Sequence, residues 1–433
     1  MGRKGIAIML DERKEEAFCT ILREELQLAT GCTEPIAVAY CAARLRQVLG
    51  QRPCRILAEV SGNILKNVKS VVVPNTGGRR GLPAAIAVGV VAGDPEARLQ
   101  VIAHVTEEDT AAIQAYLDST DIRIDCPPTS RMLDIRLTGW TGDGHRAVVH
   151  VANNHTNIIY VERDREVLLE KPHSDSAEDN LQDKSVLNVR DILTFAETVD
   201  VSRIEDSVGR QIDCNTAIAR EGLRGDWGAN IGSTLLLSGG DVETEARAWA
   251  AAGSDARMNG CEMPVVICSG SGNQGITASV PVIVYAKYLD VDHDTMVRAV
   301  TLSDLLTIHL KTGIGRLSAY CGAVSAGCSS GAAIAWLLGG GYEGITHALV
   351  NSLATVSGMI CDGAKPSCSM KLTSGVSTAV LSAMMAMDGH CVTPVEGIIE
   401  EDVDKCIRNL TAIGRDGMNE TDRVVLGIMT HKC

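Results

Sequence analysis

The stretch KPHSDSAEDNLQ, residues 171–182, separates two parts of the chain that differ in texture. It is polar, contains Pro172 and several acidic residues, and is typical of a linker or an exposed loop. Before it, from Cys54 to about Glu170, short β-rich runs dominate, whereas after Val189 helical patterns dominate and strand runs are few. This change predicts an α+β fold class: a mainly α-helical body with a smaller α+β domain inserted into it.

The β-rich part contains several short runs that we expect to be strands, and two helical patterns between them. The expected strands are residues 55–60, 70–74, 100–105, 122–126, 132–138, 145–151 and 158–162. The expected helices are residues 82–92 and 107–116. The mixture predicts one compact α+β unit.

The first part of the chain predicts two helices. Apolar residues recur near a 3.6-residue period over residues 11–49, with a break at TGCTEP, residues 30–35. Gly31 fits the position after a helix end, and Thr33 can cap a second helix whose first turn tolerates Pro35. Cys32 would then stand at a helix N-terminus, where the helix dipole lowers the pKa of a thiol.

We expect three regions. Residues 1–52 form helices that pack on the catalytic body, residues 53–175 form the α+β domain, and residues 176–433 form a mainly helical catalytic domain. The apolar run in residues 328–338 is rich in small side chains, which allows close packing within one protomer or between two. A homodimer is the expected assembly.

Composition excludes several functions. The chain has 40 Lys and Arg against 54 Asp and Glu, a net charge of -14, so neither nucleic acid nor an anionic membrane is an expected partner. No apolar run reaches the roughly 18 residues of a membrane span, and residues 1–10 lack the features of a signal peptide. We therefore expect a cytoplasmic protein, in which the 15 cysteines are candidates for metal binding or catalysis.

Two cysteine segments are unusual. LSAYCG at residues 317–322 and MICDGAKPSCSMK at residues 359–371 place thiols beside Gly, Pro and small residues, where an inorganic cofactor can approach the backbone. The spacing of Cys361 and Cys368 is not that of a zinc finger, and on spacing alone buried structural cysteines are the simpler interpretation. Three thiolates on a cubane cluster would leave one iron open, and an open iron can act as a Lewis acid.

Six segments in order along the chain together resemble a known family. They are GCTEP at 31–35, SGNILKN at 61–67, PNTGG at 74–78, HTN at 155–157, SGSGNQGI at 269–276 and CDGAK at 361–365. As a set they resemble the L-cysteine desulfidase family, which is related to the α-chain of oxygen-sensitive bacterial L-serine dehydratases. The resemblance extends from residue 31 to residue 371.

The resemblance implies a [4Fe-4S] enzyme without pyridoxal phosphate. Such an enzyme eliminates sulfide from L-cysteine to give aminoacrylate, which becomes pyruvate and ammonia. By position, Cys321, Cys361 and Cys368 correspond to the cluster ligands. Cys32 is implied as either a fourth ligand or an acid/base thiol, and we favour the acid/base role because a helix N-terminus suits a thiolate that must exchange its proton.

Two further cysteines are alternatives for the cluster. Cys328 would replace one of the three ligands if the alignment with the serine dehydratases is the better one. Cys433 resembles the C-terminal cysteine that can occupy the open iron in related serine dehydratases, and a frayed tail is the simpler interpretation.

The chemistry of β-elimination requires a carboxylate clamp, a base and an electrophile. Residues 269–275 follow the β-like run 265–268 and offer unobstructed backbone N–H groups as a nest for a carboxylate. We expect catalytic roles for Cys32, His155 and Lys371. The expected substrate-binding residues are Ser61, Asn63, Lys66, Asn67, Asn75, Thr76, Ser271, Asn273 and Gln274. Turn chemistry is the simpler interpretation of the asparagines.

Other interpretations remain. Gly270, Gly272 and Gly275 match a dinucleotide fingerprint, but residues 277–284 are β-branched and contain Pro281, which argues against the helix that this fingerprint requires. The same loop resembles that of pyridoxal-phosphate lyases, which would need an α/β sheet and a Schiff-base lysine. L-serine is the alternative substrate, and a non-catalytic metal or redox-sensing protein is the alternative class.

Overall fold

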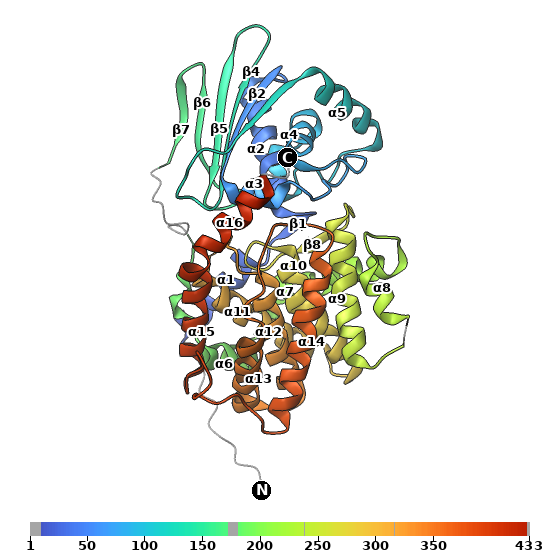
Figure 1. Cartoon of the computed structure of the whole chain (residues 1–433), viewed down its shortest axis with the longest axis vertical. Coiled ribbons are helices and arrows are strands. Elements are labelled where there is room, and N and C mark those ends of the chain that lie inside the picture. Colours follow the sequence, from blue (N-terminus) through green and yellow to red (C-terminus); the bar gives the residue numbers. More distant parts are fainter. Residues whose placement is uncertain (1–9, 172–180, 238, 316, 431–433) are drawn as a thin grey trace.

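The computed structural model describes residues 10–171, 181–237, 239–315 and 317–430 (Figure 1). An α+β unit lies above a larger helical body, so the predicted fold class is confirmed. Most of the linker predicted at residues 171–182, and Cys433, lie outside the described residues. Among the described residues, no helix has the length and apolarity that crossing a membrane requires.

The α+β unit is built on one mixed sheet of six strands. In spatial order these are β3 (Asp121–Asp125), β2 (Arg55–Val60), β4 (Asp134–Trp140), β5 (Arg146–Ala152), β6 (Ile158–Arg163) and β7 (Glu166–Glu170). Only the β2 and β3 pair is parallel, with Ile56 opposite Ile122. Strands β2 to β6 confirm predicted runs, whereas β7 was not predicted. Helices α4 (Gly81–Ala92) and α5 (Glu107–Ser119) confirm both predicted helices.

Two predicted strands are wrong. Residues 70–74 form only an isolated bridge between Val72 and Arg80. Gln100 ends a 3-10 helix, η1 (Pro95–Gln100), and residues 101–104 form turns. In both segments the β-branched side chains are buried in the core, for example Val73 and Ile102. A buried turn requires apolar side chains just as a buried strand does. A short apolar run in the sequence therefore does not distinguish a strand from a buried turn.

The N-terminal segment also differs from the prediction. Helix α1 (Glu12–Glu25) ends early, and a short strand β1 (Leu28–Thr30) follows and pairs antiparallel with β8 (Pro264–Val266). Gly31 therefore follows a strand, not a helix, with a φ of 71° that favours glycine. The N-cap of α2 (Thr33–Leu49) is Cys32, and the Thr33 hydroxyl donates to the Gly270 carbonyl at 2.8 Å.

Helix α2 packs on the sheet of the α+β unit, although residues 1–52 as a whole were expected on the helical body. The Cys41 thiol contacts the Val149 carbonyl of β5 at 3.5 Å, and α2 also lies along α4. Every side chain from Thr33 to Ala43 is buried, so this helix needs partners on all sides. Helix α1 packs on the body, against α7 (Glu205–Arg224) and α11 (His293–Thr312), and β1 joins the body through β8.

The helical body is formed around α10. Besides α7 and α11, its helices are α6 (Val189–Thr198), α8 (Ile231–Leu236), α9 (Val242–Met258), α10 itself (Gly272–Tyr288), α12 (Gly322–Leu337), α13 (Gly341–Val356), α14 (Cys368–Met387) and α15 (Val403–Ala412). Three short helical turns, η2 (Lys184–Val186), η3 (Val201–Arg203) and η4 (Ile413–Gly417), also belong to it. A side chain at Gly222 would lie 1.9 Å from the Ala252 carbonyl oxygen, and one at Gly331 2.6 Å from that of Ala379. Glycine thus allows α7 to contact α9, and α12 to contact α14, at backbone distance.

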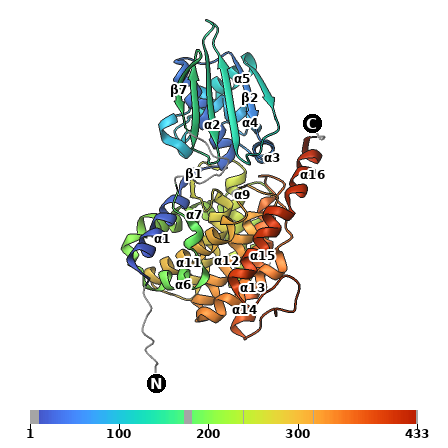
Figure 2. The same ribbon diagram turned by 90° about the vertical axis from the view of Figure 1, so that its left-hand side faces the viewer.

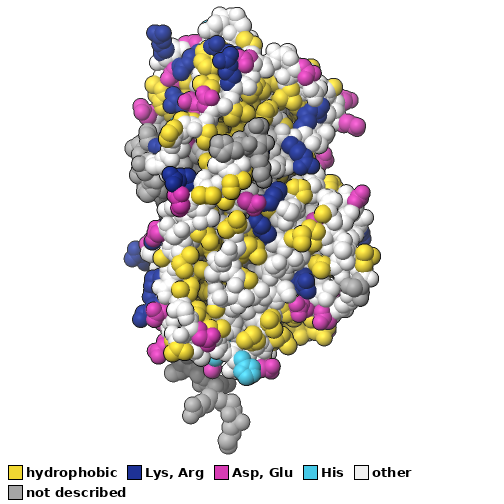
Figure 3. Space-filling view, viewed as in Figure 1, with side chains coloured by type: hydrophobic (Ala, Val, Ile, Leu, Met, Phe, Trp, Pro, Cys, Tyr) yellow, Lys and Arg dark blue, Asp and Glu magenta, His cyan; other side chains and the backbone are white. Residues whose placement is uncertain are grey.

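The outer face of α14 is uncharged. Met370, Leu381 and Met384 are half or more exposed, and Lys371 is the only charged residue of this helix. Apolar side chains are visible over the front of the helical body, where α14 lies (Figure 3). The homodimer stays a prediction.

The last helix, α16 (Asn419–Thr430), joins the two units. It leaves the helical body and reaches α3 (Gly62–Val68) at the base of the α+β unit (Figures 1 and 2). The seven-residue helix α3 was not predicted, because its sequence is rich in residues that are common in turns.

Candidate active site

A cavity of about 100 Å³ lies where the α+β unit meets the helical body. We call it the cysteine cavity, because four cysteines from three separate segments line it. Its sulfur, charged and polar lining residues are Cys32, Glu34, Asn67, Arg257, Ser271, Asn273, Gln274, Lys311, Ser318, Tyr320, Cys321, Cys361, Cys368 and Lys371.

Backbone pairing holds two of the cysteines together. The Cys321 N–H donates to the Met359 carbonyl at 3.1 Å, and the Cys361 N–H donates to the Ala319 carbonyl at 2.5 Å. Cys368 begins α14, and its thiol lies 3.7 Å from the Gly363 carbonyl. The two cysteine segments predicted from the sequence therefore meet in one place.

Four helices begin at the cysteine cavity. Cys32, Ser271 and Cys321 are the N-caps of α2, α10 and α12, and Cys368 is the first residue of α14. Within the described part of the chain, none of these helices has a side-chain cap on its first backbone N–H groups. Uncapped N–H groups and the positive ends of helix dipoles favour a bound anion.

Three cationic side chains add to this positive potential: Arg257, Lys311 and Lys371. Lys371 is neutralised in part, because its ammonium donates to the Asp362 carboxylate at 2.6 Å and to the Ile360 carbonyl at 2.7 Å. Burial lowers the pKa of Lys371, but the bond and charge of Asp362 outweigh it, so the net pKa is raised. Lys371 is therefore a fixed cation and not a base.

Arg257 differs from Lys371, because no described residue forms an ion pair with it. Its side chain is 3% exposed and lies in the last turn of α9. Its Nη1 donates to the Asn273 Oδ1 at 3.0 Å, whereas its Nε finds no acceptor among the described residues. A buried cation without an anion is costly, so this side chain is suited to a carboxylate ligand. The sequence analysis missed Arg257, because its burial is visible only in the folded chain.

Burial dominates the chemistry of the thiols. It raises the pKa of Cys32 to about 12, although Arg257 lowers it in part. It likewise raises the pKa of Cys321 to about 11, and raises that of Cys368. The predicted lowering of the Cys32 pKa is therefore wrong: Cys32 does stand at a helix N-terminus, but desolvation outweighs the dipole.

Glu34 is a second residue that the sequence analysis missed. It lies in the first turn of α2, is buried, and accepts a hydrogen bond from Asn67 Nδ2 at 3.3 Å, and its Oε2 lies 3.1 Å from Thr33 Oγ1. Burial raises its pKa above the usual value of a carboxyl. A buried carboxyl with a raised pKa in a cavity is a candidate proton carrier. Its position inside the GCTEP segment was the available signal.

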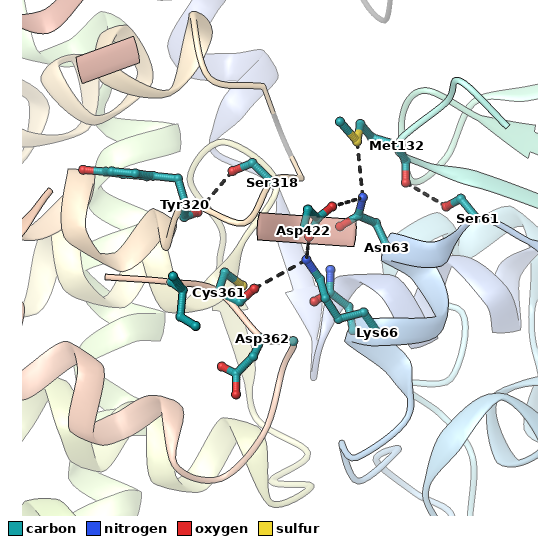
Figure 4. A network of polar contacts seen from close by, with 12 residues as sticks. Ser61, Asn63, Lys66, Met132, Ser318, Tyr320, Cys361, Asp362 and Asp422 are labelled. Carbon is teal, nitrogen blue, oxygen red and sulfur yellow. Dashed lines mark hydrogen bonds and ion pairs between the residues drawn. The ribbon is translucent and has the colours of Figure 1, made fainter. Parts of the chain in front are cut away.

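The predicted substrate-binding residues fall into three groups. Ser271, Asn273, Gln274 and Asn67 line the cysteine cavity. Ser61, Asn63 and Lys66 do not. Ser61 caps α3 and donates to the Met132 carbonyl at 2.7 Å, and Asn63 and Lys66 bind Asp422 of α16 (Figure 4).

Three other predicted residues lie elsewhere in the described structure. Asn75 Nδ2 donates to the Ile102 carbonyl at 2.7 Å, and Thr76 Oγ1 donates to the Val73 carbonyl at 2.6 Å, so both stabilise turns. His155 is buried in a different cavity of about 390 Å³ beside Glu24 and Glu25. Among the residues that the structure describes, no histidine lines the cysteine cavity.

Cys328 is fully buried within α12 and does not line the cysteine cavity. It lies on the face of α12 that packs in the core, so the structure does not support it as an alternative ligand. As they stand, no three His, Cys, Asp or Glu side chains in the described ranges are close enough to bind one metal ion. The cysteines share a cavity without forming a closed ligand set.

The argument against a helix after Gly272 is wrong. Helix α10 begins there and continues through Pro281, because the whole helix is buried up to Ala286 and tertiary packing outweighs propensity. The dinucleotide interpretation still fails, since β8 pairs antiparallel with β1 in a two-stranded sheet and is not part of a parallel βαβ unit.

Four cysteines and four helix N-termini meet at one cavity, and a comparison with known families shows to which family this fold belongs. Residues 96–427 match the family model described as serine dehydratase alpha chain. The chain belongs to this family.

Three similar proteins carry the name UPF0597 protein. One from Desulfitobacterium hafniense is 46% identical over 98% of both chains. One from Treponema denticola is 44% identical over 97% of this chain and 99% of its own, and one from Lachnoclostridium phytofermentans is 45% identical over 94% and 98%. The predicted relation to serine dehydratases is confirmed, and the desulfidase branch stays a prediction.

Proposed function

We propose that the protein is an iron–sulfur-dependent lyase that eliminates sulfide from L-cysteine to give pyruvate, ammonia and hydrogen sulfide. The observation that carries the proposal is the cysteine cavity itself, where four uncapped helix N-termini and the unpaired Arg257 surround four thiols. Such a cavity suits an anionic cofactor together with an anionic substrate.

Cys321, Cys361 and Cys368 are the residues that would hold a [4Fe-4S] cluster. The chemistry of the donors fits, because thiolates are the usual ligands of these clusters and the surrounding positive potential would offset their charge. The described side chains, as placed, are not yet close enough together to bind one metal ion. When bound, the cluster supplies an open iron that acts as a Lewis acid toward the leaving sulfur or oxygen. The chain must supply the remaining functions.

Arg257 and the start of α10 are placed to orient the substrate. The Nε–H of Arg257, which has no acceptor among the described residues, and the backbone N–H groups that follow Ser271 can donate together to one carboxylate. Asn273 already accepts from Arg257 at 3.0 Å, which holds the guanidinium at the cavity wall. Fixing the carboxylate orients the Cα proton toward the rest of the cavity.

Two buried groups can move protons in this site. Glu34 has a raised pKa, which brings a carboxyl toward the range in which it works as a general base. Cys32 keeps its proton, because burial raises its pKa to about 12, so it suits the role of proton donor. We assign the acid/base work to this pair, in line with the role expected for Cys32.

The surroundings of Cys32 favour a thiol substrate over a hydroxyl substrate. The Cys32 sulfur lies 3.5 Å from the Met258 sulfur, and Val71, Ala364 and Cys368 complete the same apolar patch. Sulfur and methyl groups are polarisable and offer no strong hydrogen bond to a hydroxyl. L-serine, giving pyruvate and ammonia, is the second candidate, and the name of the matching family favours it.

Anaerobic reconstitution with iron and sulfide, followed by steady-state kinetics on both amino acids, tests this proposal. We expect kcat/KM for L-cysteine to exceed that for L-serine by about tenfold or more, since polar mismatch in an apolar patch costs at least this much. Pyruvate and sulfide should form in equal amounts. Faster pyruvate release from L-serine would reverse the substrate choice, and turnover of neither would refute the function.

Substitution of Arg257 tests the carboxylate site. For Arg257→Met we expect kcat/KM to fall by about 10- to 100-fold, mostly through KM, because one charge-assisted bond to the substrate is lost. The apoprotein should unfold at the same temperature or higher, because a buried unpaired cation is removed. The matched control is Arg247→Met. Arg247 lies on the same helix, but its Nη1 is 3.8 Å from Glu243 Oε1, so this arginine already has an anionic partner. An unchanged KM for Arg257→Met contradicts the assignment.

A further inference from the structure

Helix α16 is the last element of the described chain, and it packs against α3. Packing alone does not explain why a carboxylate, that of Asp422, lies at this contact. Asp422 accepts a hydrogen bond from Asn63 Nδ2 at 2.9 Å and forms an ion pair with Lys66 Nζ at 2.5 Å (Figure 4). The Lys66 side chain is 2% exposed and that of Asp422 is 17% exposed. A buried lysine depends on such a partner, because without one its charge is uncompensated.

Lys66 also touches the segment that carries Cys361. Its Nζ lies 3.5 Å from the Cys361 carbonyl oxygen, on the side of Lys66 that faces the helical body (Figure 4). Gly363 has a φ of 93°, and a side chain there would lie 2.3 Å from the Lys66 carbonyl oxygen. The segment from Cys361 to Gly363 therefore rests directly on Lys66, through both its side chain and its backbone.

The rest of α16 is fastened to the same short helix. A side chain at Gly62 would lie 2.3 Å from Leu426 Cδ2, so Leu426 packs directly on the α3 backbone. Lys69 Nζ donates to the Met429 carbonyl at 2.7 Å. These contacts place Asp422 over Lys66, although the two residues are 356 positions apart in the sequence.

We propose that Asp422 is a positioning residue that acts through Lys66 on the Cys361 segment. By neutralising Lys66, it keeps the lysine against the Cys361 carbonyl, and α16 thereby determines how firmly this thiol is held at the cysteine cavity. The inference rests on the proposed function in one respect, namely that Cys361 is a cluster ligand.

Two readouts test the proposal, and one of them needs no iron. The first is the rate at which iodoacetamide alkylates Cys361 in the apoprotein, followed by peptide mass spectrometry. The exposed Cys54 serves as the internal reference. The second is the rate at which a chelator bleaches the absorbance of the reconstituted protein near 400 nm.

For Asp422→Asn we expect both rates to rise about tenfold, because the half-buried Cys361 segment loses its support and opens more often. Leu426→Ala weakens the docking of α16 without touching the ion pair, and should raise both rates in the same direction. Asp416→Asn is the control, since Asp416 is exposed and paired only with its neighbour Arg415 at 2.7 Å. It should match the wild type.

Unchanged Cys361 alkylation in folded Asp422→Asn and Leu426→Ala overturns the proposal. If Asp422→Asn does not fold, Leu426→Ala decides it alone. If the wild type takes up no iron, the proposed function fails, yet the alkylation rates still decide whether α16 holds Cys361. A rise at Cys361 together with an equal rise at every buried cysteine would indicate general unfolding and would also overturn the specific role.

Discussion

Cys361→Ala is expected to abolish cluster binding and lyase activity together while the chain stays folded. Cys361 is half-buried. Its backbone N–H, and not its thiol, forms the hydrogen bond to the Ala319 carbonyl, so loss of the thiol leaves this pairing intact. Loss of the sulfur removes one of three donors that a cluster would need. We expect kcat/KM to fall by about 10³-fold or more, since the electrophile of the reaction is lost with the metal.

The measurement is an iron and sulfide count with an absorbance spectrum after anaerobic reconstitution. The wild type should hold about four irons per chain with a broad band near 400 nm, and the variant should have neither. Cys328→Ala is the matched control, since Cys328 is a buried cysteine of α12 outside the cavity. It should lose some stability and keep its iron. Iron retained in Cys361→Ala, or lost in Cys328→Ala, would contradict the ligand assignment.

Asp304→Asn is expected to change how stability depends on pH. Asp304 lies on α11 with no exposed surface, and burial raises its pKa to about 8 although Gln211, which donates to it at 3.0 Å, and Cys268 lower it in part. The unfolded carboxyl loses its proton near pH 4. Between these values the folded chain binds the extra proton, so its free energy of unfolding falls as pH rises from about 4 to about 8.

The expected size follows from the linkage. One proton contributes about 1.4 kcal/mol per pH unit, so the wild type loses on the order of 5 kcal/mol across this range through Asp304 alone. Asparagine is neutral throughout and keeps an oxygen for Gln211. Asp304→Asn should therefore match the wild type near pH 4 to 5 and exceed it by several kcal/mol at pH 8.

Urea unfolding of the apoprotein at pH 5, 6.5 and 8 measures this effect. Asp416→Asn, at an exposed carboxylate, is the control and should keep the wild-type slope of stability against pH. The same slope in Asp304→Asn would show that Asp304 is ionised in the folded chain, and would contradict the prediction.

The sequence allowed the local elements with clear patterns to be predicted, and missed those that depend on distant partners. Strand β4 shows the alternation that is typical of a strand, and helix α4 shows the density of apolar residues that is typical of a buried helix. The segment at residues 100–105 has the composition of a strand, but it pairs with none of the described strands. Helix α3 is stabilised by α16, which no local pattern can show.

The candidate site divides in the same way. Cys321, Cys361 and the loop at residues 269–275 carry recognisable motifs, and the structure brings them to one cavity. Arg257 and Glu34 gain their importance from burial, which depends on tertiary packing. Asn75 belongs to a motif of the resemblance, yet its amide stabilises a turn. A motif thus indicates the family more reliably than it assigns each member a role.

The pairing of β1 with β8 also bears on how the protein is made. Leu28 lies opposite Val266, and Cys32 meets Cys361 and Cys368 at one cavity. The proposed ligands Cys321, Cys361 and Cys368 all leave the ribosome late in synthesis, so the donor set is incomplete for most of translation. Under the proposed function, iron must therefore be delivered after the chain is nearly finished.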